Sequence, residues 1–456
     1  MSIRNKPWFN SLTVSIVMGL IMTFTVFNLS RWKNNSVIIH DIQVYYSYLP
    51  ALFIYNDLSF QFKYKEGIAK EVSDNVWYLT TPEGKPVQKM TCGLSLLYAP
   101  FFFIGHAFAL LLGEPANGYS TVYQMAIALS SLFYAWVSIF IMRKLLRTFF
   151  DDRSTALTLA FVYLGTNLFF YIISEGAMSH NYSVFVITLF LYLCVKWIEN
   201  KKAFLLFLIG LTGGLAALIR PVNAIIFLFP LLYFILSLKK EELKKYASVS
   251  SLLLLIAGGL LAISPQLFYW KTATGSWIYY SYSDEGFFFL NPAIIKGVFS
   301  FRKGWLIYTP LVLFGLWGFY WLYKKQKSIA IPSILIIAIY SYVAFSWWCW
   351  WYGGSFGMRA MIDVLPFIAL GFAAFSENML NNHENPYSTK LYVAAVLLGI
   401  GLNQFQVYQY RKGILHYDSM TSQAYWKIFG QIHYPENYDT FVESPDYEAA
   451  KRGEDR

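Results

Sequence analysis

Apolar runs of about 20 residues recur along the whole sequence, and they constrain the fold more than any other feature. A helical run of that length matches the hydrocarbon thickness of a bilayer. The composition agrees, since 57% of the residues are hydrophobic and 14% are charged, against about a quarter charged in soluble domains. The sequence therefore predicts an all-α polytopic membrane protein. Twelve runs qualify, at residues 9–29, 92–112, 119–142, 154–173, 178–195, 203–219, 222–238, 246–264, 305–323, 329–346, 360–376 and 390–410.

The distribution of lysine and arginine decides which runs cross, because cytoplasmic loops carry an excess of both. If all twelve cross, the basic loops after the third, fifth, seventh and ninth runs lie opposite Arg4 and Lys6. If the run at 92–112 does not cross, all of them share one side. We therefore predict eleven transmembrane helices, with 92–112 as a helix broken at Pro100 in the outer interface. The alternative, in which this run crosses and the charge rule fails, stays open.

Three pieces of the chain are predicted to lie on the outer side. They are a first loop at 30–118, a second loop at 265–304 and a tail at 411–456, which follows a transmembrane domain at 1–410. The run at 9–29 has the basic start of a signal peptide but no small-residue cleavage site, so we interpret it as a retained anchor. The expected location is the cytoplasmic membrane, with the large loops facing the exterior or periplasm.

The net charge and the cysteines exclude two classes of function. The formal charge of +10 comes from 36 Lys and Arg against 26 Asp and Glu, and the cytoplasmic loops account for the excess. We therefore expect no nucleic-acid partner. Cys92, Cys194 and Cys349 are too few and too scattered for a disulfide framework or a zinc site.

Asp41 is the first acid after the first apolar run, in the stretch IIHDIQVYYSYLPAL. Apolar residues follow it at helical spacing, which predicts an amphipathic helix along the membrane interface. An Asp before such a run is also a good N-cap, and that interpretation stays open. A carboxylate half desolvated among aromatic residues suits a general base, and Asp41 is the candidate catalytic residue.

Glu175 and His180 lie in SEGAMSH, a short outer loop at bilayer depth. Ionisable groups are costly there and indicate either structural ion pairs or a polar cleft. Both interpretations stay open for Glu175. A divalent metal between Asp41 and Glu175 is a further alternative. Apart from that metal, the sequence indicates no cofactor.

Basic and aromatic residues from separate outer loops complete the predicted site. A single arginine at a helix mouth often reaches to lipid phosphate, but several on one face with two acids suit a substrate phosphate held by bidentate contacts. The stretch WWCWWYGGSFG is typical of an interfacial belt, and it can also stack on a sugar ring. The residues predicted to bind substrate are Glu175, His180, Lys89, Arg220, Arg302, Lys303, Arg359 and Trp351.

This layout resembles the GT-C glycosyltransferases, the multi-spanning group that contains protein O-mannosyltransferases and lipid A aminoarabinose transferases. The shared plan is an acid after the first span, a large first outer loop, an acid in the next outer loop and basic residues before later spans. The motifs IRPVN, SHN and WWCWWYGGSFGMR look like those of bacterial relatives of these enzymes. His40 and Ile42 flank Asp41 where the mannosyltransferases carry an Asp-Glu pair. The likeness covers most of residues 1–410.

The resemblance implies a sugar donor on a polyprenyl phosphate, because nucleotide sugars are not available outside the cytoplasmic membrane. The sequence agrees, having neither a G-x-G-x-x-G nor a G-x-x-x-x-G-K-[ST] loop. In such an enzyme Asp41 takes the proton of an acceptor hydroxyl on a lipid, glycan or protein, and the sugar inverts in a single displacement. A lipid or solute transporter remains the alternative, although transporters usually show paired broken helices in matching halves.

Overall fold

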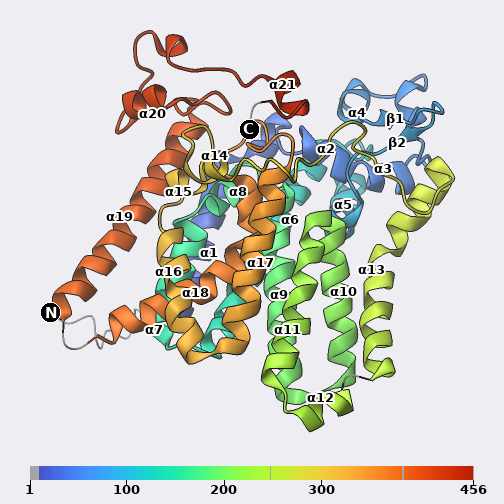
Figure 1. Cartoon of the computed structure of the whole chain (residues 1–456). Helices are drawn as coiled ribbons and strands as arrows, with labels where there is room; N and C mark the ends of the chain where they lie inside the picture. The colour runs from blue at the N-terminus through green and yellow to red at the C-terminus, as the bar shows by residue number, and fades with distance from the viewer. Residues whose placement is uncertain (1–9, 247, 383–384, 455–456) are drawn as a thin grey trace.

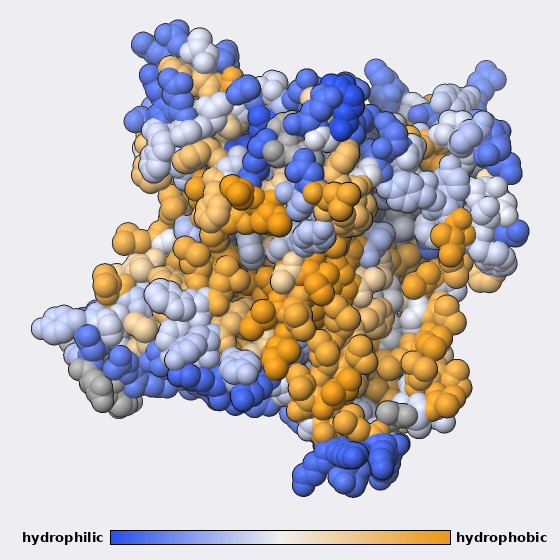
Figure 2. Space-filling view, in the orientation of Figure 1, coloured by the Kyte–Doolittle hydropathy of each residue, from blue (hydrophilic) through white to orange (hydrophobic). Residues whose placement is uncertain are grey.

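The computed structural model describes residues 10–246, 248–382 and 385–454, and helices make up most of this part of the chain (Figure 1). The longer helices stand side by side in a bundle. Figure 2 shows an apolar band across the middle of the molecule, with hydrophilic residues above and below it. The chain is therefore an all-α polytopic membrane protein. We call the end that carries α2 (Asp41–Tyr46) and the tail the outer end, and the end that carries α12 (Lys240–Tyr246) the inner end.

Within the described residues, eight helices are long and apolar enough to cross a bilayer. Seven of them coincide with predicted spans, and the eighth is α5 in the run at 92–112. The eight are α1 (Ser11–Leu29) with the turn η2, α5 (Gly93–Leu112), α6 (Thr121–Arg147), α9 (Ser179–Asn200), α13 (Val249–Thr274), α17 (Lys327–Ser346), α18 (Leu365–Leu380) with the turn η5 (Arg359–Val364), and α19 (Pro386–Arg411).

The other four predicted spans correspond to shorter or interrupted helices. Two of them are apolar helices of fewer than 18 residues, and two are divided by non-helical residues. The total of eleven spans remains a prediction, and Arg4 and Lys6, which entered the charge argument, lie outside the described residues. The four segments are α7 (Asp152–Leu164) with α8 (Leu168–Ile173), α10 (Ala203–Ile219), η4 (Pro221–Phe227) with α11 (Leu228–Ser237), and α15 (Trp305–Tyr308) with α16 (Val312–Lys325).

Short elements from three parts of the chain cover the outer end (Figure 1). The single helix expected after Asp41 is two helices, α2 and α3, separated at Ser47. The later part of the first outer loop contains α4 and a small antiparallel hairpin, β1–β2. The outer elements are η2 (Arg31–Asn34), α2 (Asp41–Tyr46), α3 (Tyr48–Phe53), η3 (Gln61–Tyr64), α4 (Lys70–Asn75), β1 (Leu79–Thr80), β2 (Pro86–Val87), α14 (Ile294–Phe299), α20 (Ser422–Ile428), η6 (Tyr438–Thr440) and α21 (Tyr447–Lys451).

The helix α5 corrects one expectation, because it continues unbroken through Pro100. A proline inside a helix removes one hydrogen bond and bends the helix, and packing against neighbours can keep the helix intact. Near its start, the hydroxyl of Ser95 donates to the carbonyl of Tyr45 in α2. Beyond its end, the hydroxyl of Tyr46, also in α2, donates to the carbonyl of Gly118. The start of α5 and the chain six residues beyond its end therefore both contact α2. Whether α5 crosses the membrane stays open, because its length and composition suit a span.

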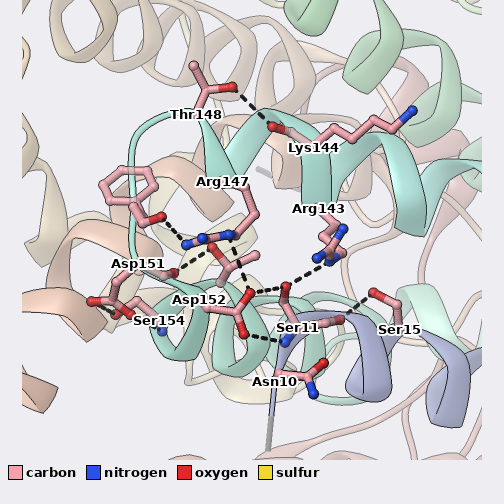
Figure 3. A network of polar contacts seen from close by, with 12 residues as sticks. Asn10, Ser11, Ser15, Arg143, Lys144, Arg147, Thr148, Asp151, Asp152 and Ser154 are labelled. Carbon is pink, nitrogen blue, oxygen red and sulfur yellow. Dashed lines mark hydrogen bonds and ion pairs between the residues drawn. The ribbon is translucent and has the colours of Figure 1, made fainter.

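The inner end of the bundle is fastened by a polar network around Asp152 (Figure 3). The carboxylate of Asp152, in α7, accepts hydrogen bonds from the backbone N–H of Ser11 at 2.9 Å and from its hydroxyl at 2.6 Å. Arg143 of α6 donates to the same hydroxyl at 2.7 Å, and Arg147 lies 3.3 Å from Asp152. The network thus ties the start of α1 to α6 and α7.

The helix α18, together with η5, lies at the centre of the bundle, because 94% of the most apolar 18-residue stretch in Arg359–Leu380 is buried. It packs closely on α16, where a Cβ added at Gly318 would lie 1.8 Å from the carbonyl oxygen of Gly371. Polar residues at the outer end of this helix, in η5, therefore face other protein segments instead of lipid. This placement determines the environment of Arg359 and Asp363.

Candidate functional site

A cavity of about 380 Å³ lies between the helix bundle and the outer elements. Its volume falls in the range of small-molecule sites. Its walls come from α2, residues 89–91, the start of α9, η4, the loop 280–287, the outer end of α17, the loop 347–353, η5 and α21. Five of the nine predicted site residues line it, namely Asp41, Lys89, His180, Arg220 and Arg359.

Asp41 is the first residue inside α2, and its carboxylate faces Arg359. The Oδ2 atom of Asp41 lies 3.5 Å from Nη1 of Arg359, and the Asp41 side chain is 39% exposed. The N-cap interpretation is wrong, because the capping position belongs to His40, whose φ is 52°. A positive φ is rare for a residue with a side chain. The backbone turn at His40 therefore places Asp41, and its carboxylate remains accessible from the cavity.

Arg220 is held by Asp363, an acid that the sequence analysis did not select. The Nη1 atom of Arg220 donates to Oδ2 of Asp363 at 2.8 Å, and the hydroxyl of Tyr340 donates to the same oxygen at 3.1 Å. The Nδ1 atom of His180 lies 3.6 Å from the other carboxylate oxygen. The Asp363 side chain is fully buried. The ion pair with Asp363 fixes the guanidinium group of Arg220 through Nη1 and leaves the other N–H donors of that group for the cavity.

The sequence did contain a signal for Asp363. It follows Arg359 by four residues in RAMID, and it is an acid at membrane depth, which is the same criterion that selected Glu175. The sequence does not show that Asp363 pairs with Arg220 while Arg359 turns to Asp41. That division depends on how η5 is rotated against α9 and η4.

Lys89 pairs with Glu285, a second acid that the sequence analysis missed. The ammonium group of Lys89 also lies 5.3 Å from the centre of the Tyr282 ring. The hydroxyl of Ser281 donates to the carbonyl of Lys89 at 2.6 Å. These contacts join the first outer loop to the second along one wall of the cavity.

Glu175 lies next to the cavity and is not part of its wall. Burial raises the pKa of Glu175, while the positive charges of Arg359 and Arg31 act against that rise and the charge of Asp41 adds to it. Glu175 therefore belongs to the same polar region as Asp41. Among the residues that the structure describes, no group of three or more His, Cys, Asp or Glu side chains is arranged to hold a metal ion. A metal between the two acids stays a prediction.

The remaining predicted residues, Arg302, Lys303 and Trp351, lie in the outer elements beside the cavity. The buried ammonium group of Lys303 donates to the carbonyls of Ser355 and Tyr417, and burial lowers the pKa of Lys303 to about 7. The guanidinium carbon of Arg302 lies 5.5 Å from the centre of the Trp351 ring. The two hydrogen bonds of Lys303 fasten the tail to the loop that follows α17.

The tryptophan-rich stretch divides into two sets. Trp347, Trp348 and Tyr352 line the cavity. Trp350 and Trp351 are 2% and 0% exposed, so the interpretation of an interfacial belt is wrong for these two. The chain then bends at residues 352–354, where Tyr352 has a φ of 60°. The stretch therefore builds an aromatic wall on the side of the cavity below the tail.

Comparisons with known proteins add no family to this geometry. No family model matches the sequence, and no curated protein matches it either. The resemblance to GT-C glycosyltransferases therefore stays an expectation from the general layout and the short motifs.

Proposed function

We propose that the protein is a glycosyltransferase that moves a sugar from a polyprenyl-phosphate carrier to an acceptor hydroxyl on the outer side of the membrane. The observation that carries the proposal is the cavity that joins the accessible carboxylate of Asp41 to the guanidinium groups of Arg220 and Arg359. A carboxylate accepts a proton, and guanidinium groups bind phosphate oxygens in pairs. The cavity thus combines the two chemistries that such a transfer needs.

The apolar part of the wall supports a lipid-linked donor. Ile219, Val222 and Val343 line the cavity, and they belong to or adjoin α10, η4 and α17 of the apolar bundle. A polyprenyl chain needs an apolar path between the bilayer and the site. The wall therefore suits a carrier whose phosphate meets the arginines while its chain stays among apolar side chains.

In the proposed step, the Asp41 carboxylate accepts the proton of the acceptor hydroxyl as the hydroxyl oxygen attacks the anomeric carbon. The bond between that carbon and the carrier phosphate oxygen breaks, and the phosphate leaves with the electron pair. Arg220 and Arg359 stabilise the negative charge of the leaving phosphate. A single displacement inverts the configuration at the anomeric carbon. The new glycosidic bond and the protonated carboxylate balance the step.

The contacts behind these side chains suit preorganisation, in which charged groups are held in place before the reaction begins. Asp363 and Tyr340 fix one end of the Arg220 guanidinium group. The 3.5 Å contact with Arg359 orients the Asp41 carboxylate. Neither arginine then has to reorganise when the phosphate charge develops.

The test is the release of polyprenyl phosphate from a labelled sugar carrier by the purified protein and its Asp41→Asn variant. Asparagine keeps the shape but cannot take the proton, so transfer should fall by about 10² to 10⁴ while carrier binding persists. The matched control is Asp74→Asn, the same change on the exposed side of α4. Parent-level transfer by Asp41→Asn would refute the assigned base, and no release by the parent with any sugar carrier would refute the function.

A further inference from the structure

Among the described residues of the tail beyond α19, which end at residue 454, one side chain lines the cavity, that of Tyr447. This residue begins α21 and lines the same cavity as Asp41. The tail folds back over the outer end to bring it there (Figure 1). Nothing in the proposed step uses this residue.

The position of the Tyr447 ring is fixed from behind. Its hydroxyl donates to Oδ2 of Asp418 at 3.0 Å, and the other oxygen of this buried carboxylate accepts a hydrogen bond from Ser419 at 2.7 Å. The ring makes T-shaped contacts with Trp351 and Trp348, whose ring centres lie 5.4 Å and 6.3 Å from its own. Because the hydroxyl donates its hydrogen bond to Asp418, Tyr447 presents its ring to the cavity.

The tail is also held to the loops around the cavity. The ammonium group of Lys451 lies 3.2 Å from the Asp284 carboxylate in the second outer loop. Gly453 packs on the ring of Phe288 so closely that an added Cβ would lie 2.6 Å from it. Because Asp284 precedes Glu285, the partner of Lys89, the same loop joins the tail to the first outer loop. The tail is thus a built part of the cavity wall.

We propose that Tyr447 contacts the transferred sugar and helps to determine which sugar the carrier bears. This inference rests on the proposed function. A ring held by its hydroxyl offers its aromatic surface, which suits the C–H face of a pyranose ring better than it suits a phosphate. The charged groups that suit a phosphate are instead Arg220, immediately before η4, and Arg359, in η5. The wall formed by the tail would therefore recognise the sugar, and the arginines would recognise the carrier phosphate.

The experiment measures the affinity of the purified full-length protein for undecaprenyl phosphate and for the same carrier bearing glucose, mannose or N-acetylglucosamine. The readout is the ratio of the affinity for each sugar-bearing carrier to that for the bare carrier. In Tyr447→Ala the ratio for the preferred sugar should fall by about five- to tenfold, the size expected for a lost aromatic contact, while bare-carrier affinity stays within about twofold. Tyr447→Phe keeps the ring and should keep the ratio.

A second variant controls for general effects on the tail. Trp426→Ala removes an aromatic ring of α20 that is 60% exposed and lies away from the cavity, so it should leave every ratio unchanged. An unchanged ratio in Tyr447→Ala would overturn the inference, and so would an equal loss of affinity for bare and sugar-bearing carriers. A parent protein that binds no carrier would instead refute the proposed function, and the inference with it.

Discussion

Replacing Asp363 by asparagine would remove the negative charge that holds Arg220 and keep the shape of the side chain. The Asp363 side chain is fully buried and that of Arg220 is 14% exposed, so water cannot replace the lost charge. Removing one partner of such a buried pair typically costs about 3–5 kcal/mol. We expect about 3 kcal/mol, because the amide oxygen of the new side chain can still accept hydrogen bonds from Arg220 and Tyr340.

The assay is reversible unfolding of the detergent-solubilised protein by denaturant, with Asp41→Asn as the matched control. Asp41 also faces an arginine, but at 3.5 Å and with 39% of its side chain exposed. Such a pair contributes less than about 1 kcal/mol, so this control should unfold almost as the parent does. A loss below about 1 kcal/mol for Asp363→Asn, or equal losses in the two variants, would refute the assignment of Asp363 as a buried anchor.

Three further predictions follow from particular side chains. The pKa of Lys303 is about 7 in the folded protein against 10.5 for a free lysine, so the unfolded chain binds more protons between these values and the free energy of unfolding should rise from pH 7 to 10.5. Lys303→Met should lose this slope in pH-dependent unfolding. Lysine at Arg220 or Arg359 keeps the charge but not the bidentate donor, so either change should lower transfer, and parent-level rates in both would refute the phosphate contact. In intact cells, a cysteine introduced at Asn437 should be labelled by an impermeant reagent and one introduced at Lys240 should not. The opposite pattern would reverse the predicted topology.

The apolar runs were enough to predict the fold class and the positions of seven of the helices that are long enough to span. This is possible because a helix in a bilayer satisfies its own backbone hydrogen bonds, so each apolar run specifies a helix without reference to the rest of the chain. The sequence was less informative about α5. Whether Pro100 breaks that helix depends on packing against its neighbours, which hydropathy does not describe.

For the candidate site too, the sequence predicted some features and the packing of the chain decided others. The cost of charge at membrane depth selected His180, which lines the cavity, and Glu175, which does not. The other predicted residues that line it were selected as an interfacial acid, Asp41, or as outer-loop cations, Lys89, Arg220 and Arg359. Lys303 satisfied similar criteria but is buried against the tail.

Only the tertiary structure decided the partners of these groups. It paired Arg220 with Asp363 and Lys89 with Glu285, and it brought Tyr447 from the tail into the cavity wall. The physical reason is that hydropathy and charge are properties of each residue and its near neighbours. A partner is set by the rotation of each helix and by the path of each loop, which depend on contacts between segments far apart in the chain.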